Sequence, residues 1–241
     1  VPQANVTYDA SISGKYLDVA SWAGGLRRYD LSINLRKPQN VPMPMDWQSQ
    51  LSTCQDSAYI DTVSKITGES IPVLKDYYLN PRDPGDGGNH NHKAFSVLAY
   101  DDRIWVGTAN GINKGRIVEE ITQISENEFE ILSCIEWDHY KYPTNGISGN
   151  FVVALGKQDW NGQTTIWAAT VGTGEVGEMQ GLSYSRDDGV SWKTALIGER
   201  VYNIESKDSL VFVSTSSGLW KSLDGENWAK LDPAIEQSML N

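Results

Sequence analysis

Two short stretches of the chain place aspartate, glycine and tryptophan in nearly the same order. Residues 185–192 read SRDDGVSW, and residues 222–228 read SLDGENW. Carboxylates crowded beside an indole ring can bind a cation or hold a sugar. The same residues also suit a tight turn, in which aspartate accepts from backbone N–H groups and glycine takes a positive φ. The elements around the two stretches distinguish a binding site from a structural turn.

A third stretch, NPRDPGDGGNHNH at residues 80–92, has the composition of a metal-binding loop. Six side chains in it carry possible ligand atoms: Asp83, Asp86, Asn89, His90, Asn91 and His92. The oxygen ligands suit calcium, whereas the His-x-His pair suits zinc. The spacing departs from an EF-hand loop, so a surface loop without metal is favoured and a metal site is the alternative. If a metal binds, we expect calcium on Asp83, Asp86 and Asn89.

The strands that must position these residues are repeated along the chain. Four segments each contain an apolar alternating run, a Ser or Thr, a short connection and a Gly-aliphatic pair: 16–30, 103–116, 165–185 and 210–222. Each follows a similar strand, at 6–12, 94–100, 150–156 and 201–207. A fourth strand follows in three of the copies, at 128–137, 191–197 and 227–232. Val, Ile, Thr and Trp dominate these runs, as expected for strands.

Four short antiparallel strands, repeated in this way, predict an all-β fold of the β-propeller type, either whole or partial. A β-sandwich also spaces its strands regularly but does not need four copies of one strand–turn–strand pattern. We expect a single domain over 1–241, with blades at about 6–32, 94–137, 150–197 and 201–232. A long insertion covers about 33–93, and a divergent fifth blade within it is an alternative. Since propellers have about four to eight blades, we also expect further blades or another chain as partners.

SRDDGVSW resembles the Asp-box, also called the bacterial neuraminidase repeat, whose pattern is Ser-x-Asp-x-Gly-x-Thr-Trp. The matching residues of the two stretches are Ser185, Asp187, Gly189, Ser191 and Trp192, then Ser222, Asp224, Gly225 and Trp228. The second stretch is one residue shorter, and the first half of the chain matches only through its strand pattern. The resemblance implies structural turns between the third and fourth strands of a blade. IWVGTANG and GLWKS also resemble ligand-sensor propellers of secreted bacterial proteins.

The resemblance leaves an enzyme as the alternative, because Asp-boxes occur in sialidases and in endoglucanases that act on xyloglucan. A sialidase would need an Arg-Ile-Pro motif, which the sequence lacks. Glycoside hydrolysis needs two carboxylates at a defined separation. The sequence does not pair the available candidates, which are Glu119, Glu120, Asp138, Glu175 and Glu178. With three histidines and no Gly-x-Ser-x-Gly elbow, a nucleophilic triad is also disfavoured, so no catalytic residue is predicted.

Charge and cysteine content limit the partners of the chain. The net charge of −11 over 241 residues opposes binding to nucleic acid. No apolar run approaches the roughly 20 residues that span a bilayer, so no membrane insertion is expected. The two cysteines, Cys54 and Cys134, are compatible with one disulfide or with two buried thiols.

Together these patterns predict a non-catalytic binding or scaffold module that contacts a protein or a carbohydrate outside the cytoplasm, secreted, periplasmic or on the cell surface. No cofactor is expected, with calcium as the alternative, and the ligand-binding residues are otherwise unknown. Five aromatic residues are expected to be exposed on the connecting loops: Trp22, Trp137, Tyr140, Tyr142 and Trp160.

Overall fold

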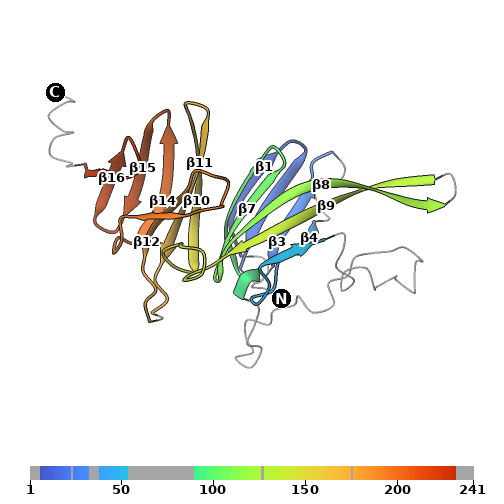
Figure 1. The fold of residues 1–241 in the computed structure, drawn as a ribbon, viewed down its shortest axis with the longest axis horizontal. Helices are drawn as coiled ribbons and strands as arrows, with labels where there is room; N and C mark the ends of the chain where they lie inside the picture. The colour runs from blue at the N-terminus through green and yellow to red at the C-terminus, as the bar shows by residue number, and fades with distance from the viewer. Residues whose placement is uncertain are drawn as a thin grey trace. The chain divides into compact units, whose positions relative to one another are not determined.

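The computed structural model of the protein describes residues 6–22, 24–32, 38–53, 90–125, 128–174 and 176–231. In these residues the regular structure is β-strand, apart from one turn of 3-10 helix, η2 at His90–His92. The chain divides into two compact units, residues 1–139 and 140–241, and each unit contains two antiparallel sheets (Figure 1). No helix in the described ranges has the length and apolarity to cross a membrane.

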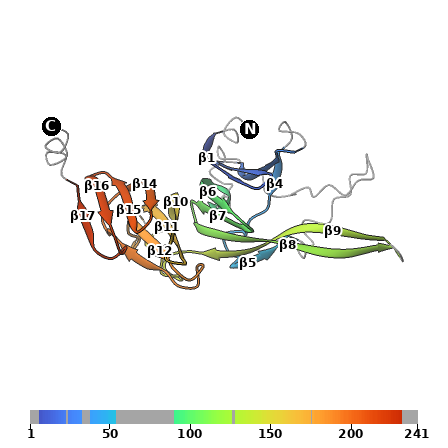
Figure 2. The ribbon, with the colours of Figure 1, turned by 90° about the horizontal axis from the view of Figure 1, so that it is seen from above.

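The first unit contains blades 1 and 2. Blade 1 is a meander of four strands in chain order: β1 Thr7–Ser13, β2 Tyr16–Ser21, β3 Gly25–Asp30 and β4 Gln39–Val41. Blade 2 has five strands: β6 Ala94–Tyr100, β7 Arg103–Thr108, β8 Gly111–Ser125, β9 Glu128–Tyr140 and, at its edge beside β9, β5 Gln50–Ser52. Strands β8 and β9 continue past the others as a two-stranded ribbon (Figures 1 and 2).

The second unit contains blades 3 and 4, each a four-stranded meander in chain order. Blade 3 consists of β10 Phe151–Trp160, β11 Gln163–Val171, β12 Gly181–Ser185 and β13 Lys193–Ala195. Blade 4 consists of β14 Val201–Lys207, β15 Leu210–Thr215, β16 Gly218–Ser222 and β17 Trp228–Lys230. The predicted all-β class and the four antiparallel blades are confirmed. A single domain over 1–241 stays a prediction.

The described part of the 33–93 insertion extends the neighbouring blades. Strand β4 pairs with β3 and completes blade 1, which therefore reaches beyond residue 32. Strand β5 pairs with β9 and adds a fifth strand to blade 2. Each is only three residues long, which is too short for a period-two pattern to show in the sequence.

Within each unit, the two blades share one hydrophobic core. In the second unit, Trp167 and Leu182 of blade 3 are packed with Val211 and Val213 of blade 4. In the first unit, Leu26 of blade 1 belongs to the same buried cluster as residues of blade 2. Each blade therefore buries one face against its neighbour, which is what a single four-stranded sheet cannot do for itself.

The first strands of neighbouring blades lie side by side and are joined by side chains that bond to the backbone (Figure 2). In the first unit, the Ser11 hydroxyl accepts from the Ala99 N–H at 2.9 Å. In the second unit, the Ser206 hydroxyl donates to the Lys157 carbonyl at 2.9 Å. Polar side chains thus satisfy backbone groups that no strand partner reaches.

His92 is buried in the first unit, where η2 leads into β6. Its exposed fraction is 5%, and its Nε2 lies 3.0 Å from the Met43 carbonyl oxygen, to which it donates as a neutral ring. Burial lowers the pKa of His92 to about 4 from its ordinary 6.5, even though Met43 and Asp46 favour the charged form. This imidazole is therefore neutral in the folded protein at neutral pH.

We predict that the first unit loses stability when the pH falls from about 6.5 to about 4. As the pH falls, His92 becomes protonated in the unfolded chain before it does so in the folded protein. The difference between the two pKa values corresponds to a loss of about 3 kcal/mol in the free energy of unfolding. Urea unfolding at pH 7.0 and pH 4.5 measures the loss. His92→Gln keeps a donor for Met43 and should show a smaller loss, whereas His90→Gln should behave as the parent. An unchanged pH dependence in His92→Gln would contradict the assignment.

Candidate functional site

The first Asp-containing turn joins the third and fourth strands of blade 3, β12 and β13. The Ser185 hydroxyl accepts from the Gly189 N–H at 2.8 Å and donates to Asp187 Oδ1 at 2.8 Å. Asp187 in turn accepts from the Ser191 N–H at 2.8 Å and from the Ser191 hydroxyl at 2.5 Å. These hydrogen bonds, first from the Ser191 hydroxyl and then from its backbone, hold the pKa of Asp187 below its ordinary value. The carboxylate is thus occupied by its own turn.

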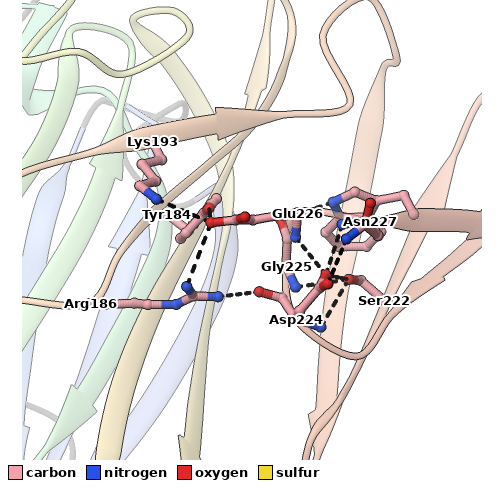
Figure 3. Close-up of polar contacts among 9 residues, drawn as sticks. Tyr184, Arg186, Lys193, Ser222, Asp224, Gly225, Glu226 and Asn227 are labelled. Atoms are coloured by element: carbon pink, nitrogen blue, oxygen red, sulfur yellow. Dashed lines mark hydrogen bonds and ion pairs between the residues drawn. The ribbon is translucent and has the colours of Figure 1, made fainter.

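The second turn joins β16 and β17 in blade 4 and has the same bonding pattern (Figure 3). The Ser222 hydroxyl accepts from the Gly225 N–H at 2.8 Å. Asp224 Oδ1 accepts from the backbone N–H groups of Glu226 and Asn227, at 2.9 and 2.7 Å, and Oδ2 accepts from the Asn227 side chain at 2.7 Å. The Asn227 amide and then the backbone N–H groups lower the pKa of Asp224 strongly.

The two turns contact each other through Arg186. Its guanidinium donates to the Asp224 carbonyl oxygen and lies 3.9 Å from the Glu226 carboxylate (Figure 3). It also lies 5.0 Å from the centre of the Tyr184 ring, at the distance of a cation–π contact. The second turn is therefore fixed by blade 3 as well as by its own strands.

Gly225 is the point where the second turn touches the core. It has a φ of +78°, and a Cβ placed on it would lie 2.6 Å from the ring of Trp167. Trp167 is 1% exposed and cannot move without disturbing the core of the unit. Glycine is therefore needed here for the close approach as well as for the backbone conformation.

A pocket of about 520 Å³ lies beside these turns and draws side chains from blades 3 and 4. We call it the aromatic pocket and define it by Tyr184, Trp192, Lys193, Glu226 and Trp228. The rings of Tyr184 and Trp192 are mostly buried and form its walls. The side chains of Lys193 and Glu226 are 66% and 54% exposed and form an ion pair of 3.1 Å. An apolar surface with a charged pair at its edge suits binding.

The only carboxylate that lines the aromatic pocket among the described residues is that of Glu226. It accepts from Lys193 and, at 3.4 Å, from the Tyr184 hydroxyl. The contact with Lys193 is the largest cause that lowers the pKa of Glu226, so this carboxylate is ionised at neutral pH. The pocket thus offers an exposed ion pair rather than a proton donor.

No pattern in the sequence marks Tyr184, Lys193 or Glu226 as site residues. Lys193 begins β13 and Glu226 lies inside the second turn, 33 residues further along the chain. Their pairing depends on how blades 3 and 4 face each other, and no spacing in the sequence records that. The adjacent Asp-containing turns were the one signal that pointed to this region.

The predicted calcium ligands Asp83, Asp86 and Asn89 lie outside the described residues, and calcium binding there stays a prediction. The neighbouring His90 has its Nδ1 3.5 Å from Asp46, while His92 points into the core and bonds to Met43. These two rings serve different contacts and do not form a shared zinc site. No group of three His, Cys, Asp or Glu side chains suited to a metal occurs in the described ranges.

The five aromatic residues expected to be exposed differ in their burial. Trp160 is 44% exposed, as predicted. The prediction for Trp137 is wrong: it is 2% exposed, because β9 continues beyond it and its ring lies against Gly115 of β8. Trp22 and Tyr140 are partly buried and pack on other rings, those of Phe95 and Trp192 respectively, while the Tyr142 hydroxyl donates to the Gly177 carbonyl.

Of the other residues considered in the sequence, Cys134 is buried and disulfide-bonded, and Cys54 lies outside the described residues. The candidate carboxylates Asp138 and Glu178 belong to different units. Asp138 accepts from the Gln50 side chain at 2.9 Å. Glu178 accepts from the backbone of Asn150 and from Thr173, which makes it part of the local loop structure.

A chain of antiparallel four- and five-stranded blades is a protein of the propeller type, and comparison with solved structures agrees. The extracellular domain of the hybrid two-component system BT4673 from B. thetaiotaomicron is 11% identical with a TM-score of 0.50, and the match covers 93% of this chain and 22% of that one. An ancestral GH74 enzyme is 15% identical with a TM-score of 0.54, covering 95% of this chain and 24% of that one.

The chain thus spans about a quarter or less of these two structures. At such identities, the likeness concerns the fold alone. No protein-family model and no curated protein matches the sequence.

We predict that Gly225→Ala destabilises the second unit by about 3 kcal/mol, through a positive φ and overpacking against Trp167. Gly198→Ala is the matched control, because Gly198 also has a positive φ, +95°, but open space around it. It should cost about 1 kcal/mol. Chemical unfolding followed by tryptophan fluorescence measures both, and equal losses would contradict the role of Trp167.

Proposed function

We propose that the chain is a non-catalytic binding module of an extracytoplasmic protein, which contacts a protein or carbohydrate partner at the aromatic pocket. The observation that carries the proposal is the grouping of three aromatic side chains, those of Tyr184, Trp192 and Trp228, around one ion pair. Aromatic side chains provide a large contact area at low entropic cost, and they dominate the energy of many binding surfaces.

Binding is favoured over hydrolysis by the charge state of the pocket. A glycoside hydrolase of the Asp-box type would need a second carboxylate about 5–9.5 Å from the first, with a raised pKa on the acid. Glu226 is the only acid among the described residues that line the aromatic pocket, and Lys193 lowers its pKa. Asp187 and Asp224 are engaged within their turns.

We propose further that the two turns are Asp-boxes with a structural role. Both use a serine hydroxyl to accept from the glycine N–H and an aspartate to accept from the residues that follow. This bonding supports the motif assignment made on Ser185, Asp187, Gly189 and Trp192, and on Ser222, Asp224, Gly225 and Trp228.

A location outside the cytoplasm is part of the proposal and is supported by one fold neighbour, which is an extracellular domain. Because the chain spans only 22% and 24% of the two neighbours, further blades or another chain remain proposed partners. Nucleic acid is not proposed as a partner, because the net charge is −11.

The test uses the full chain with xyloglucan in affinity electrophoresis and sialyllactose in tryptophan-fluorescence titration. If the partner is a carbohydrate, we expect retardation or quenching without release of reducing sugar. Lys193→Glu places two carboxylates at the edge of the pocket and should weaken binding about fivefold or more. Lys207→Gln, an exposed change in β14, is the control. Sugar release that Glu226→Gln abolishes would instead establish a hydrolase.

If neither sugar binds, a photo-crosslinker at Thr194, an exposed residue that lines the pocket, tests for a protein partner. The proposal expects one defined adduct from cell-surface extract, lost in Lys193→Glu and kept in Lys207→Gln. Absence of both sugar binding and such an adduct would overturn the proposed function.

A further inference from the structure

A second pocket, of about 440 Å³, lies within the first unit between blades 1 and 2. We call it the hairpin pocket, because it lies where the β1–β2 and β6–β7 hairpins turn, at Gly14-Lys15 and Asp101-Asp102. The two hairpins are joined there by the Ser13 hydroxyl, which donates to the Asp101 carbonyl at 3.3 Å. Its volume is within the range of about 300–1,000 Å³ that is usual for small-molecule sites.

The wall that blade 1 contributes contains a buried ion pair. Asp18 of β2 and Arg28 of β3 face each other in the sheet, and Arg28 donates to both carboxylate oxygens through Nε and Nη2, at 2.8 and 3.1 Å. Their side chains are 1% and 8% exposed. The residues that follow on this face, Ala20 and Leu26, belong to the hydrophobic core. A charged pair therefore interrupts an otherwise apolar face.

A buried ion pair of this kind is a poor source of stability, because removing both charges from water costs about as much as their attraction returns. Apolar side chains of similar size at these two positions would fill the same space in the core, so the fold does not depend on the ion pair. Its position at the edge of a pocket suggests that it serves a ligand. Two hydrogen bonds to Asp18 fix the orientation of the guanidinium, and Cζ of Arg28 lies 4.6 Å from the centre of the Tyr16 ring.

The guanidinium keeps donors that its partner does not use. Asp18 engages Nε and Nη2, and among the described residues no acceptor lies on Nη1 of Arg28. Two further cations, Lys15 and Arg103, line the same pocket. Lys15 pairs with Asp30 at 3.0 Å, and Arg103 pairs with Asp102 at 2.6 Å. One side chain of each pair, Lys15 and Asp102, is more than half exposed. Such pairs are weak, so an incoming anion can compete for the cations.

Besides Asp101 and Arg103, the part of blade 2 that lines the hairpin pocket is apolar. Blade 2 contributes Ala99 from β6, Ile104 from β7 and Ile117 from β8. A ligand that fills the pocket therefore meets both the cationic donors of Lys15, Arg28 and Arg103 and the hydrocarbon of blade 2. Inorganic anions use only the cationic groups, and neutral hydrocarbons use only the apolar residues.

We propose that the hairpin pocket binds a small organic carboxylate. The carboxylate accepts from Arg28 Nη1 and is attracted by Lys15 and Arg103, since a guanidinium fork matches a planar carboxylate. The hydrocarbon body lies on Ala99, Ile104 and Ile117. This site is in the first unit, is separate from the aromatic pocket and does not rest on the proposed function of that pocket.

The experiment is a titration of the full chain followed by ¹⁵N–¹H NMR, with the Arg28 Nε–H and the Gly14 and Lys15 amides as reporters. The probes are acetate, butyrate and phenylacetate, with phenylacetamide as the neutral counterpart and inorganic phosphate as the anion without a body. We expect saturable shifts whose affinity rises about fourfold for each buried methylene. Phenylacetamide should bind at least about tenfold more weakly than phenylacetate.

Two outcomes of this titration overturn the proposal. If phosphate binds as tightly as phenylacetate, the pocket recognises negative charge and not an organic acid. If no carboxylate shifts the reporters, the pocket does not bind this class of ligand.

Variants of Lys15, which is exposed, and of Arg103, which is partly exposed, test the same proposal without changing the buried pair. Lys15→Gln and Arg103→Gln should each weaken phenylacetate binding about fivefold and leave the thermal midpoint unchanged. Lys207→Gln removes one exposed positive charge in the second unit and should change neither quantity. Full affinity in the Lys15→Gln/Arg103→Gln double variant would contradict the assignment.

Discussion

Hydrophobic contact between the facing sheets of each unit is the interaction on which the rest of the structure depends. A four-stranded meander has two faces and no layer of its own to cover them, so it becomes stable when a second sheet covers one face. Small residues make the close approach possible: Gly156 of blade 3 lies under Ile204 of blade 4, and a Cβ there would lie 3.1 Å from the isoleucine side chain. Both pockets lie where this packing gives way to polar residues.

The sequence predicted the parts of this architecture that are encoded locally. Alternating apolar runs specify the strands, and the Ser-Asp-Gly-Trp pattern specifies the turns, because each turn satisfies its polar groups from its own residues. Strands β4 and β5 were not predicted, since three residues carry no period and their pairing depends on distant partners. Trp137 was predicted to be exposed because the strand was expected to end at residue 137. In the structure β9 continues to Tyr140, since its length is set by pairing within the sheet, and Trp137 is buried.

The two pockets show how one chemical pair acquires different roles in different surroundings. Lys193 and Glu226 form an exposed pair that water screens, so each side chain can exchange its partner at little cost. Asp18 and Arg28 form the same kind of pair in a buried position, where the orientation of the guanidinium is fixed by two hydrogen bonds. Neither pairing was apparent from the sequence, because sheet register and blade packing bring the partners together.

The contact between Gly225 and Trp167 ties the second turn to the blade before it. The residue that follows the aspartate in the first turn is Asp188, which has a positive φ of 56° without being glycine. At Gly225 a positive φ is combined with contact to the Trp167 ring, so no side chain fits there. The second turn is thus fitted to the blade before it, and the sequence of the first turn, which has Asp188 in place of glycine after its aspartate, cannot simply be exchanged for it.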